Sequence, residues 1–179
     1  MSKIDTTKWK EFVIGNLFDI HPTKAYKLTN SNLYAEDGNN PVVVNSSFNN
    51  GVGGYSRLEN TENGNIVTFS DTTSADAIFY QKSPFIGYPH IQGMYPIGEY
   101  KSKWNEKSYL FFISVFRSRA IGLNFDYVNK FTREDAKKMT VKLPVDIKGN
   151  PDFVYMETYI RNLEFAVSSS LTALRSVLH

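Results

Sequence analysis

The sequence predicts an α+β fold: a curved, mostly antiparallel or mixed β-sheet with flanking helices, followed by a long C-terminal helix of the coiled-coil type. Short apolar runs between residues 9 and 96 alternate with turn-forming residues, which favours such a sheet over a doubly wound one. Helical spacing of apolar residues then occupies residues 105–117, and residues 152–178 contain neither glycine nor proline. Residues 1–150 are therefore expected to form a globular head and residues 151–179 the helix.

The first strands are expected in the N-terminal third. Residues 9–20, WKEFVIGNLFDI, predict a strand, a turn, and a second short strand or helical turn. Residues 41–44, PVVV, predict a brief apolar strand, and residues 52–57 predict another extended segment. Between these two, Asn50-Gly51 predicts a tight turn, because both residue types tolerate positive φ.

Further strands are expected at residues 65–69, 77–81 and 91–95. The polar residues 70–76 predict a loop between the first two. Residues 139–145, MTVKLPV, alternate like an edge strand.

Two helices are expected after these strands. The first covers residues 105–117, with an apolar face formed by Tyr109, Phe112, Ile113 and Phe116. The second is short and begins after Thr132, because Asp135 three residues later gives a pattern close to a capping box.

The C-terminal helix is expected to start near Pro151-Asp152, where proline suits the first turn and aspartate favours the positive helix end. Its apolar positions recur at alternating steps of three and four, with one polar interruption at Ser170. This seam consists of Phe153, Met156, Ile160, Leu163, Val167, Ser170, Leu174 and Val177. Such a helix is roughly 40 Å long, which exceeds what a small head can cover. We therefore expect the seam to face a partner; packing on the chain's own head is the alternative.

Composition restricts the class of protein. The chain has 179 residues and no cysteine, which excludes disulfides, thiolate zinc sites and cysteine nucleophiles. No window of about 18 apolar residues is present, so a soluble, cytoplasmic protein is expected. The net charge is only +2, yet residues 101–142 hold ten Lys or Arg against four acids. This segment predicts either a phosphate-contacting face or an ordinary solvated one.

The motifs of several enzyme classes are missing. The sequence contains no Pro-Pro, which the Asn/Asp-Pro-Pro-aromatic tetrapeptide of amino-methyltransferases requires, and no GxxxxGK[ST] phosphate loop. The acidic residues do not follow the order of a PD…(D/E)xK nuclease. His21, His90 and His179 lack metal-ligand spacing, and no nucleophile-elbow pattern supports a catalytic serine. We expect no catalytic residue, no metal and no cofactor.

The order of several segments resembles a known family. They are WKEFVIGNLFDI, PVVVNSSFNNGVGGY, NIVTFSDTTSADAIFYQKSPF, FDYVNKFT and finally VKLPV…GNPDFVYMETYI, between Trp9 and about Arg161. In this order they resemble the target recognition domains of DNA specificity subunits from type I and type IIB-like restriction–modification systems.

The resemblance implies a non-catalytic protein that binds double-stranded DNA. In this family each head reads one half of a split DNA sequence, and paired long helices set the spacing between the halves. Methyltransferase and restriction subunits supply the chemistry. A full specificity subunit carries two heads and two helices, so this chain resembles a half subunit or a fragment, and a symmetric homodimer through the C-terminal helices is expected.

Residue types suited to DNA contact gather in polar loops. Asn and Gln suit adenine, Arg and Lys suit guanine or phosphate, and Ser and Thr contact either partner more permissively. The predicted DNA-binding residues are Lys24, Lys27, Asn45, Ser47, Asn49, Asn50, Thr72, Thr73, Ser74, Tyr88, His90, Lys130 and Arg133. For each of them a turn-forming or solvated role is the alternative. The predicted dimerisation residues are Phe153, Met156, Ile160, Leu163, Val167 and Leu174.

Two functions thus follow from the sequence. The first is sequence-specific DNA recognition that directs methyltransferase and possibly restriction subunits to a split target. The second is an interaction or assembly module on the same fold that has lost sequence-specific DNA reading.

Overall fold

The structure, a computed structural model, describes residues 4–71, 77–123, 125 and 130–177. A central sheet of four strands has the order β2-β7-β5-β6, and each neighbouring pair is antiparallel. Its strands are β2 (Phe18–Pro22), β5 (Ile66–Ser70), β6 (Ile78–Gln81) and β7 (Ile91–Pro96). The predicted mostly antiparallel α+β fold is therefore confirmed.

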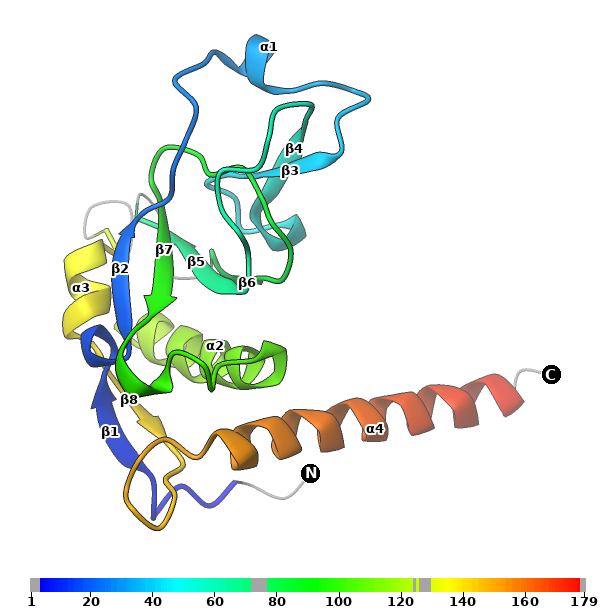
Figure 1. The fold of residues 1–179 in the computed structure, drawn as a ribbon. Helices are drawn as coiled ribbons and strands as arrows, with labels where there is room; N and C mark the ends of the chain where they lie inside the picture. The colour runs from blue at the N-terminus through cyan, green and yellow to red at the C-terminus, as the bar shows by residue number, and fades with distance from the viewer. Residues whose placement is uncertain (1–3, 72–76, 124, 126–129, 178–179) are drawn as a thin grey trace.

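Two smaller antiparallel sheets flank the central one (Figure 1). The hairpin of β3 (Asn40–Val43) and β4 (Val52–Ser56) contains the short 3-10 helix η2 (Asn49–Gly51) between its strands. The first strand, β1 (Lys10–Val13), pairs with the late strand β8 (Thr140–Leu143). This pairing joins the two ends of the head.

The remaining elements are mostly helical. They are η1 (Ile14–Asn16), α1 (Asn30–Leu33), η3 (Gly98–Tyr100), α2 (Glu106–Ile121), α3 (Arg133–Lys138) and α4 (Phe153–Val177). The capping box predicted for the short helix is present: the Thr132 hydroxyl accepts from the Asp135 backbone, while the Asp135 carboxylate accepts from the Thr132 backbone. A second capping box, made by Asn105 and Ser108, starts α2.

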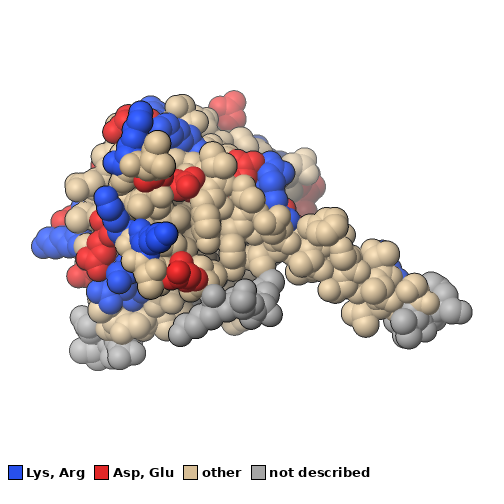
Figure 2. Space-filling view, turned by 90° about the horizontal axis from the view of Figure 1, so that it is seen from below, with Lys and Arg blue, Asp and Glu red and all other residues tan. Residues whose placement is uncertain are grey.

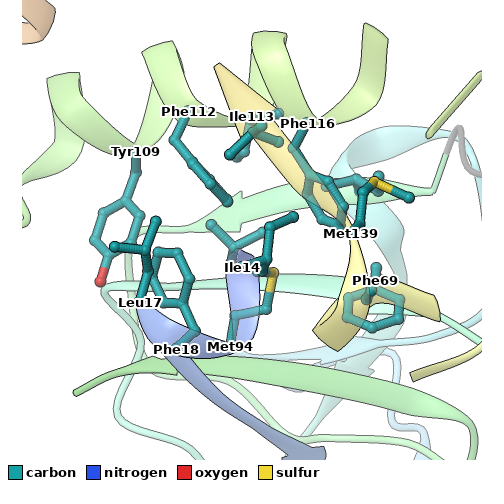
Figure 3. Close-up of a cluster of buried hydrophobic side chains, with 14 of the residues drawn as sticks. Ile14, Leu17, Phe18, Phe69, Met94, Tyr109, Phe112, Ile113, Phe116 and Met139 are labelled. Atoms are coloured by element: carbon teal, nitrogen blue, oxygen red, sulfur yellow. The ribbon is translucent and has the colours of Figure 1, made fainter. Parts of the chain in front are cut away.

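The two faces of the central sheet have different partners. Because side chains alternate along a strand, Val67, Phe69 and Met94 point to one face, where α2 covers them with its aromatic residues (Figure 3). Ile66 and Ile91 point to the other face, where they pack with Val43 of the β3–β4 hairpin. The inner strand β5 is thus buried on both faces, whereas Asp19 and His21 of the edge strand β2 are exposed on the second face.

The C-terminal helix α4 is divided into two halves. Its first half packs on the head: Met156 is fully buried, and Phe153, Tyr159 and Ile160 pack against the same core. Beyond Glu164 every residue through Ser176 is exposed, and Figure 1 shows this half projecting from the head.

The structure corrects part of the predicted seam. Phe153, Met156 and Ile160 were assigned to a partner, but they lie against the head's own core because α2 offers aromatic surface to this side of α4. Phe111 of α2 contacts Tyr159 edge-on at 5.6 Å between ring centroids, and Trp104, just before α2, contacts Phe153 edge-on at 4.9 Å. The buried side chain of Met156 has no surface to offer a second chain.

Candidate nucleic-acid interface

The loop between β3 and β4 contains four of the predicted DNA-binding residues. The amide nitrogen of Asn50 donates to the Tyr80 carbonyl and to Gln81 Oε1, both at 3.1 Å. The amide of Asn49 donates to the Val52 carbonyl at 3.2 Å. Both asparagines have positive φ, 49° for Asn49 and 54° for Asn50, a region that asparagine tolerates better than most residues. The side-chain amides of Asn49 and Asn50 therefore stabilise the turn, which was the alternative to DNA contact.

The same turn presents a residue that sequence reasoning missed. Phe48 is 81% exposed, although an exposed phenylalanine is unusual beside a tightly bonded turn. Its backbone N–H donates to the Ser46 hydroxyl at 3.1 Å, and the predicted Ser47 beside it is also exposed. An aromatic residue inside the polar run Asn45–Asn50 was the signal in the sequence.

Asn45 connects this loop to the central sheet. Its Oδ1 accepts a hydrogen bond from the Ser70 hydroxyl at 2.8 Å, so the loop lies against the end of β5. The next predicted residues, Thr72, Thr73 and Ser74, lie outside the described residues. The loop predicted around residues 70–76 therefore begins directly beside Asn45.

A polar hollow of about 320 Å³ lies where β2, β5 and β7 meet the start of α3. Its walls include two predicted residues, His90 and Arg133, and two that were not predicted to bind DNA, Asp71 and Gln92. We call this cavity, with these four residues in its wall, the polar hollow. They come from three separate segments, and only the sheet register and the packing of α3 bring them together.

Hydrogen bonds fix the floor of the polar hollow. Gln92 Nε2 donates to Asp71 Oδ2 at 2.7 Å, and the Asp71 backbone N–H donates to the His90 carbonyl at 3.1 Å. The His90 ring nitrogen Nδ1 lies 3.4 Å from Asp71 Oδ1, where the two groups attract each other when His90 is protonated. His90, the residue before β7, also has a φ of 70°, a left-handed conformation that is uncommon outside glycine.

The other predicted residues occupy different surroundings. Tyr88 donates its hydroxyl to Asn30 Oδ1 at 2.9 Å and packs against the cores around the β3–β4 hairpin. The side chains of Lys24, Lys27 and Lys130 belong to exposed residues. The structure thus places His90 beside Arg133, and Asn45 beside the end of β5. Tyr88 lies elsewhere, against the cores around the β3–β4 hairpin.

The position of the Lys24 backbone is set by a buried carboxylate. Glu62 accepts from the Lys24 backbone N–H at 2.7 Å and from the Tyr95 hydroxyl at 2.8 Å. Burial, followed by the hydrogen bond to Glu62, raises the pKa of Tyr95 well above its ordinary value, so this hydroxyl remains a donor. His21 stacks on Tyr95 with ring centroids 4.1 Å apart.

The basic segment at residues 101–142 does not make one continuous basic face. Lys107 pairs with Glu106 and Glu164, while Arg133 and Lys137 both approach Glu134. Figure 2 shows Lys and Arg in several groups on the head, interspersed with acidic side chains, and an almost uncharged projecting helix. On this face, most Lys and Arg of residues 101–142 therefore fit an ordinary solvated surface better than a phosphate-contacting one.

Within the described residues, no helix is long and apolar enough to cross a membrane. The described residues also contain no group of three or more His, Cys, Asp or Glu side chains that could hold a metal ion.

Comparison with known proteins identifies the family. Residues 6–172 match the type I restriction modification DNA specificity domain. The chain is 24% identical, over 165 residues, to the type II restriction enzyme BgcI specificity subunit S.BcgI of Heyndrickxia coagulans, covering 92% of this chain and 46% of that protein.

Solved structures share the fold. The type I restriction-modification system S subunit from M. genitalium superposes with a TM-score of 0.61 at 11% identity, over 96% of this chain and 44% of that one. The HsdS subunit from Thermoanaerobacter tengcongensis gives a TM-score of 0.58 at 11% identity, over 96% and 40%. The chain spans a little under half the length of these relatives. With the family match over residues 6–172, it belongs to the type I restriction modification DNA specificity domain family.

Proposed function

We propose that the chain is a non-catalytic recognition unit that binds one half of a split DNA sequence and directs partner methyltransferase and restriction subunits to it. The observation that carries this proposal is the match of residues 6–172 to a DNA specificity domain. The named relative is itself a specificity subunit of a restriction enzyme. A cytoplasmic location, where the DNA is, is part of the proposal.

The strand ends of the central sheet supply suitable chemistry for reading DNA. Asn45 and Ser70 at one point, and the polar hollow at the next, place amide, hydroxyl, carboxylate and guanidinium groups along one edge. Groups of this kind read base edges, while exposed lysines such as Lys24 and Lys130 suit phosphates. The inner strand β5, which is buried on both faces, positions these groups.

The projecting half of α4 supports pairing with a second copy. Val167, Leu171 and Leu174 are exposed apolar residues on one side of the helix, and residues 165–174 carry no charge. An uncharged apolar stripe of this kind is typical of a helix covered by another helix. Antiparallel pairing of two copies would place two heads on a palindromic split site.

The recognition proposal is tested by selection from duplexes that contain a randomised segment. The expected result is enrichment of a defined short sequence, with binding that weakens as salt is added, because phosphate contacts release counterions. Recovery of an unenriched pool would contradict recognition and leave the assembly role as the alternative.

The pairing proposal is tested by two matched aspartate variants. Leu171→Asp places a charge on the exposed stripe, whereas Ser169→Asp places the same charge on the opposite side of the helix. Sedimentation should show dimers for the wild type and for Ser169→Asp, and monomers for Leu171→Asp. Equal sizes for the two variants would contradict the stripe as a dimer interface.

A further inference from the structure

Buried polar atoms without a hydrogen-bond partner gather in the polar hollow. Five such side-chain atoms occur within the described residues, and three of them are Asp71 Oδ1, Gln92 Oε1 and Arg133 Nε. All three residues line the same hollow of about 320 Å³. Since a buried polar group without a partner is destabilising, three together indicate a place where a ligand completes the bonding.

The orientation of Gln92 follows from its neighbour. The residue is only 3% exposed, and its side chain lies on the same face of the sheet as Phe69, its partner in register. One end of its amide faces Asp71 Oδ2 at 2.7 Å. An ionised carboxylate only accepts, so the NH₂ group must point to Asp71, and Oε1 is left as an acceptor.

The rim of the hollow consists of side chains that have room to move. The His90 side chain is 66% exposed and contacts Asp71 Oδ1 at 3.4 Å without a hydrogen bond. The Arg133 side chain is 39% exposed, with Nε 3.5 Å from a Glu134 carboxylate oxygen. A shift of the exposed His90 side chain would open the hollow towards Asp71 and Gln92 while Arg133 Nε stays in its wall.

The three atoms define the ligand that fits. Two acceptors, Asp71 Oδ1 and Gln92 Oε1, need donors, and one donor, Arg133 Nε, needs an acceptor. On the major-groove edge, adenine presents an amino group (N6) and a ring nitrogen (N7) in this pattern, and cytosine presents its amino group (N4). On the same edge guanine and thymine present keto oxygens, which would face the two acceptors; the amino group of guanine lies on the minor-groove edge. A phosphate is disfavoured for the same reason, because it would meet the Asp71 carboxylate.

We infer that the polar hollow reads the amino group of an adenine or cytosine at one position of the DNA target. Gln92 Oε1 and Asp71 Oδ1 accept from the amino group, and Arg133 Nε donates to the ring nitrogen N7 where the base is adenine. The inference rests on the proposed DNA-recognition function and assigns one element of its specificity to these residues.

The test repeats the duplex selection with the full chain and Gln92→Met, which keeps the size and removes the acceptor. The wild type should enrich a sequence with adenine or cytosine at one position, on one strand. Gln92→Met should lose preference at that position by about 10-fold or more and keep the rest of the sequence. The matched control is Gln81→Met: Gln81 is also buried, but its amide is satisfied by Thr68 and Asn50 on the other face.

A second variant covers the case in which Gln92→Met does not fold. Asp71→Asn can still accept from Gln92 Nε2 but turns the other acceptor into a donor. Its selected sequence should shift at the same position towards guanine or thymine.

The outcomes separate the inference from the function on which it rests. A wild type that enriches no sequence contradicts the recognition function itself. A wild type that enriches a sequence, together with folded variants at Gln92 and Asp71 that enrich the same sequence at every position, overturns the inference alone and leaves a hollow filled by water.

Discussion

Residue type and residue role differ most clearly in the β3–β4 loop. Asn49 and Asn50 are of the type that reads adenine, yet their amides are bonded to Val52, Tyr80 and Gln81 within the head. Gln92 shows the opposite case, because its sequence context, IQGMYP, is that of an ordinary core strand. The turn at Asn50-Gly51 follows from the sequence, whereas the hydrogen-bond partners of Asn50 and Gln92 depend on which distant segment lies next to each residue.

Two substitutions at Asn50 separate its conformation from its hydrogen bonds. Asn50→Gly keeps the positive φ and loses the amide, so the free energy of unfolding should fall by about 1 kcal/mol. Asn50→Ala also places a Cβ in the left-handed region, and the loss should reach about 2 kcal/mol. Urea denaturation measures both changes. A folded Asn50→Gly variant that loses its DNA preference at undiminished stability would show instead that Asn50 contacts a base.

At the scale of elements, local sequence signals located most of the structure. The strands predicted at residues 41–44, 52–57, 65–69, 77–81 and 91–95 correspond to β3, β4, β5, β6 and β7, and the predicted capping box starts α3. Pro151-Asp152 stands directly before α4. The short helices α1 and η3 were not predicted, since a single turn has no apolar periodicity to detect.

Neither the order of the strands nor the contacts of α4 could be predicted from the sequence. Within the order β2-β7-β5-β6, the pairing of β2 with β7 joins residues at least 70 positions apart, such as Pro22 and Gln92, which no local pattern specifies. An apolar stripe along a helix has the same spacing whether it faces its own head or a second chain. Met156 and Leu174 therefore look alike in the sequence but occupy opposite environments.

Shortening one side chain in each half of α4 should change the free energy of unfolding by different amounts. Met156→Ala removes a fully buried side chain and should reduce the free energy of unfolding by about 2–4 kcal/mol. Leu171→Ala, on the exposed half, should change the stability of the isolated head by less than about 0.5 kcal/mol. Chemical denaturation at a concentration low enough to keep the protein monomeric measures both. Comparable losses would mean that the projecting half also packs on the head.

Acid should loosen the attachment of α4. Hydrogen bonds, first from Arg161 and then from Asn105 at the start of α2, lower the pKa of Glu157 from its ordinary value of 4.5. A lowered pKa means that this contribution to stability is present above 4.5 and is lost as the pH falls through the lower folded value. The free energy of unfolding should therefore decrease below this pH, and the decrease should be smaller in Glu157→Gln. Parallel pH profiles for the two proteins would contradict the role of this carboxylate.

At the scale of the whole molecule, the head and the free half of α4 have separate surfaces. In Figure 1, α3, which helps to line the polar hollow, and the free end of α4 lie on opposite sides of the molecule. The first half of α4 belongs to the core of the head, so the free half extends from a fixed base. A second chain on α4 would thus be held at a defined distance from the strand ends, as reading of a split site requires.

The measurement that tests recognition most directly compares the affinity of the full chain for its enriched duplex and for a scrambled duplex of equal composition, over a series of salt concentrations. We expect the enriched duplex to bind at least about 100-fold more tightly, with both affinities falling as salt rises. Equal affinity for the two duplexes at every salt concentration would contradict sequence recognition by this chain.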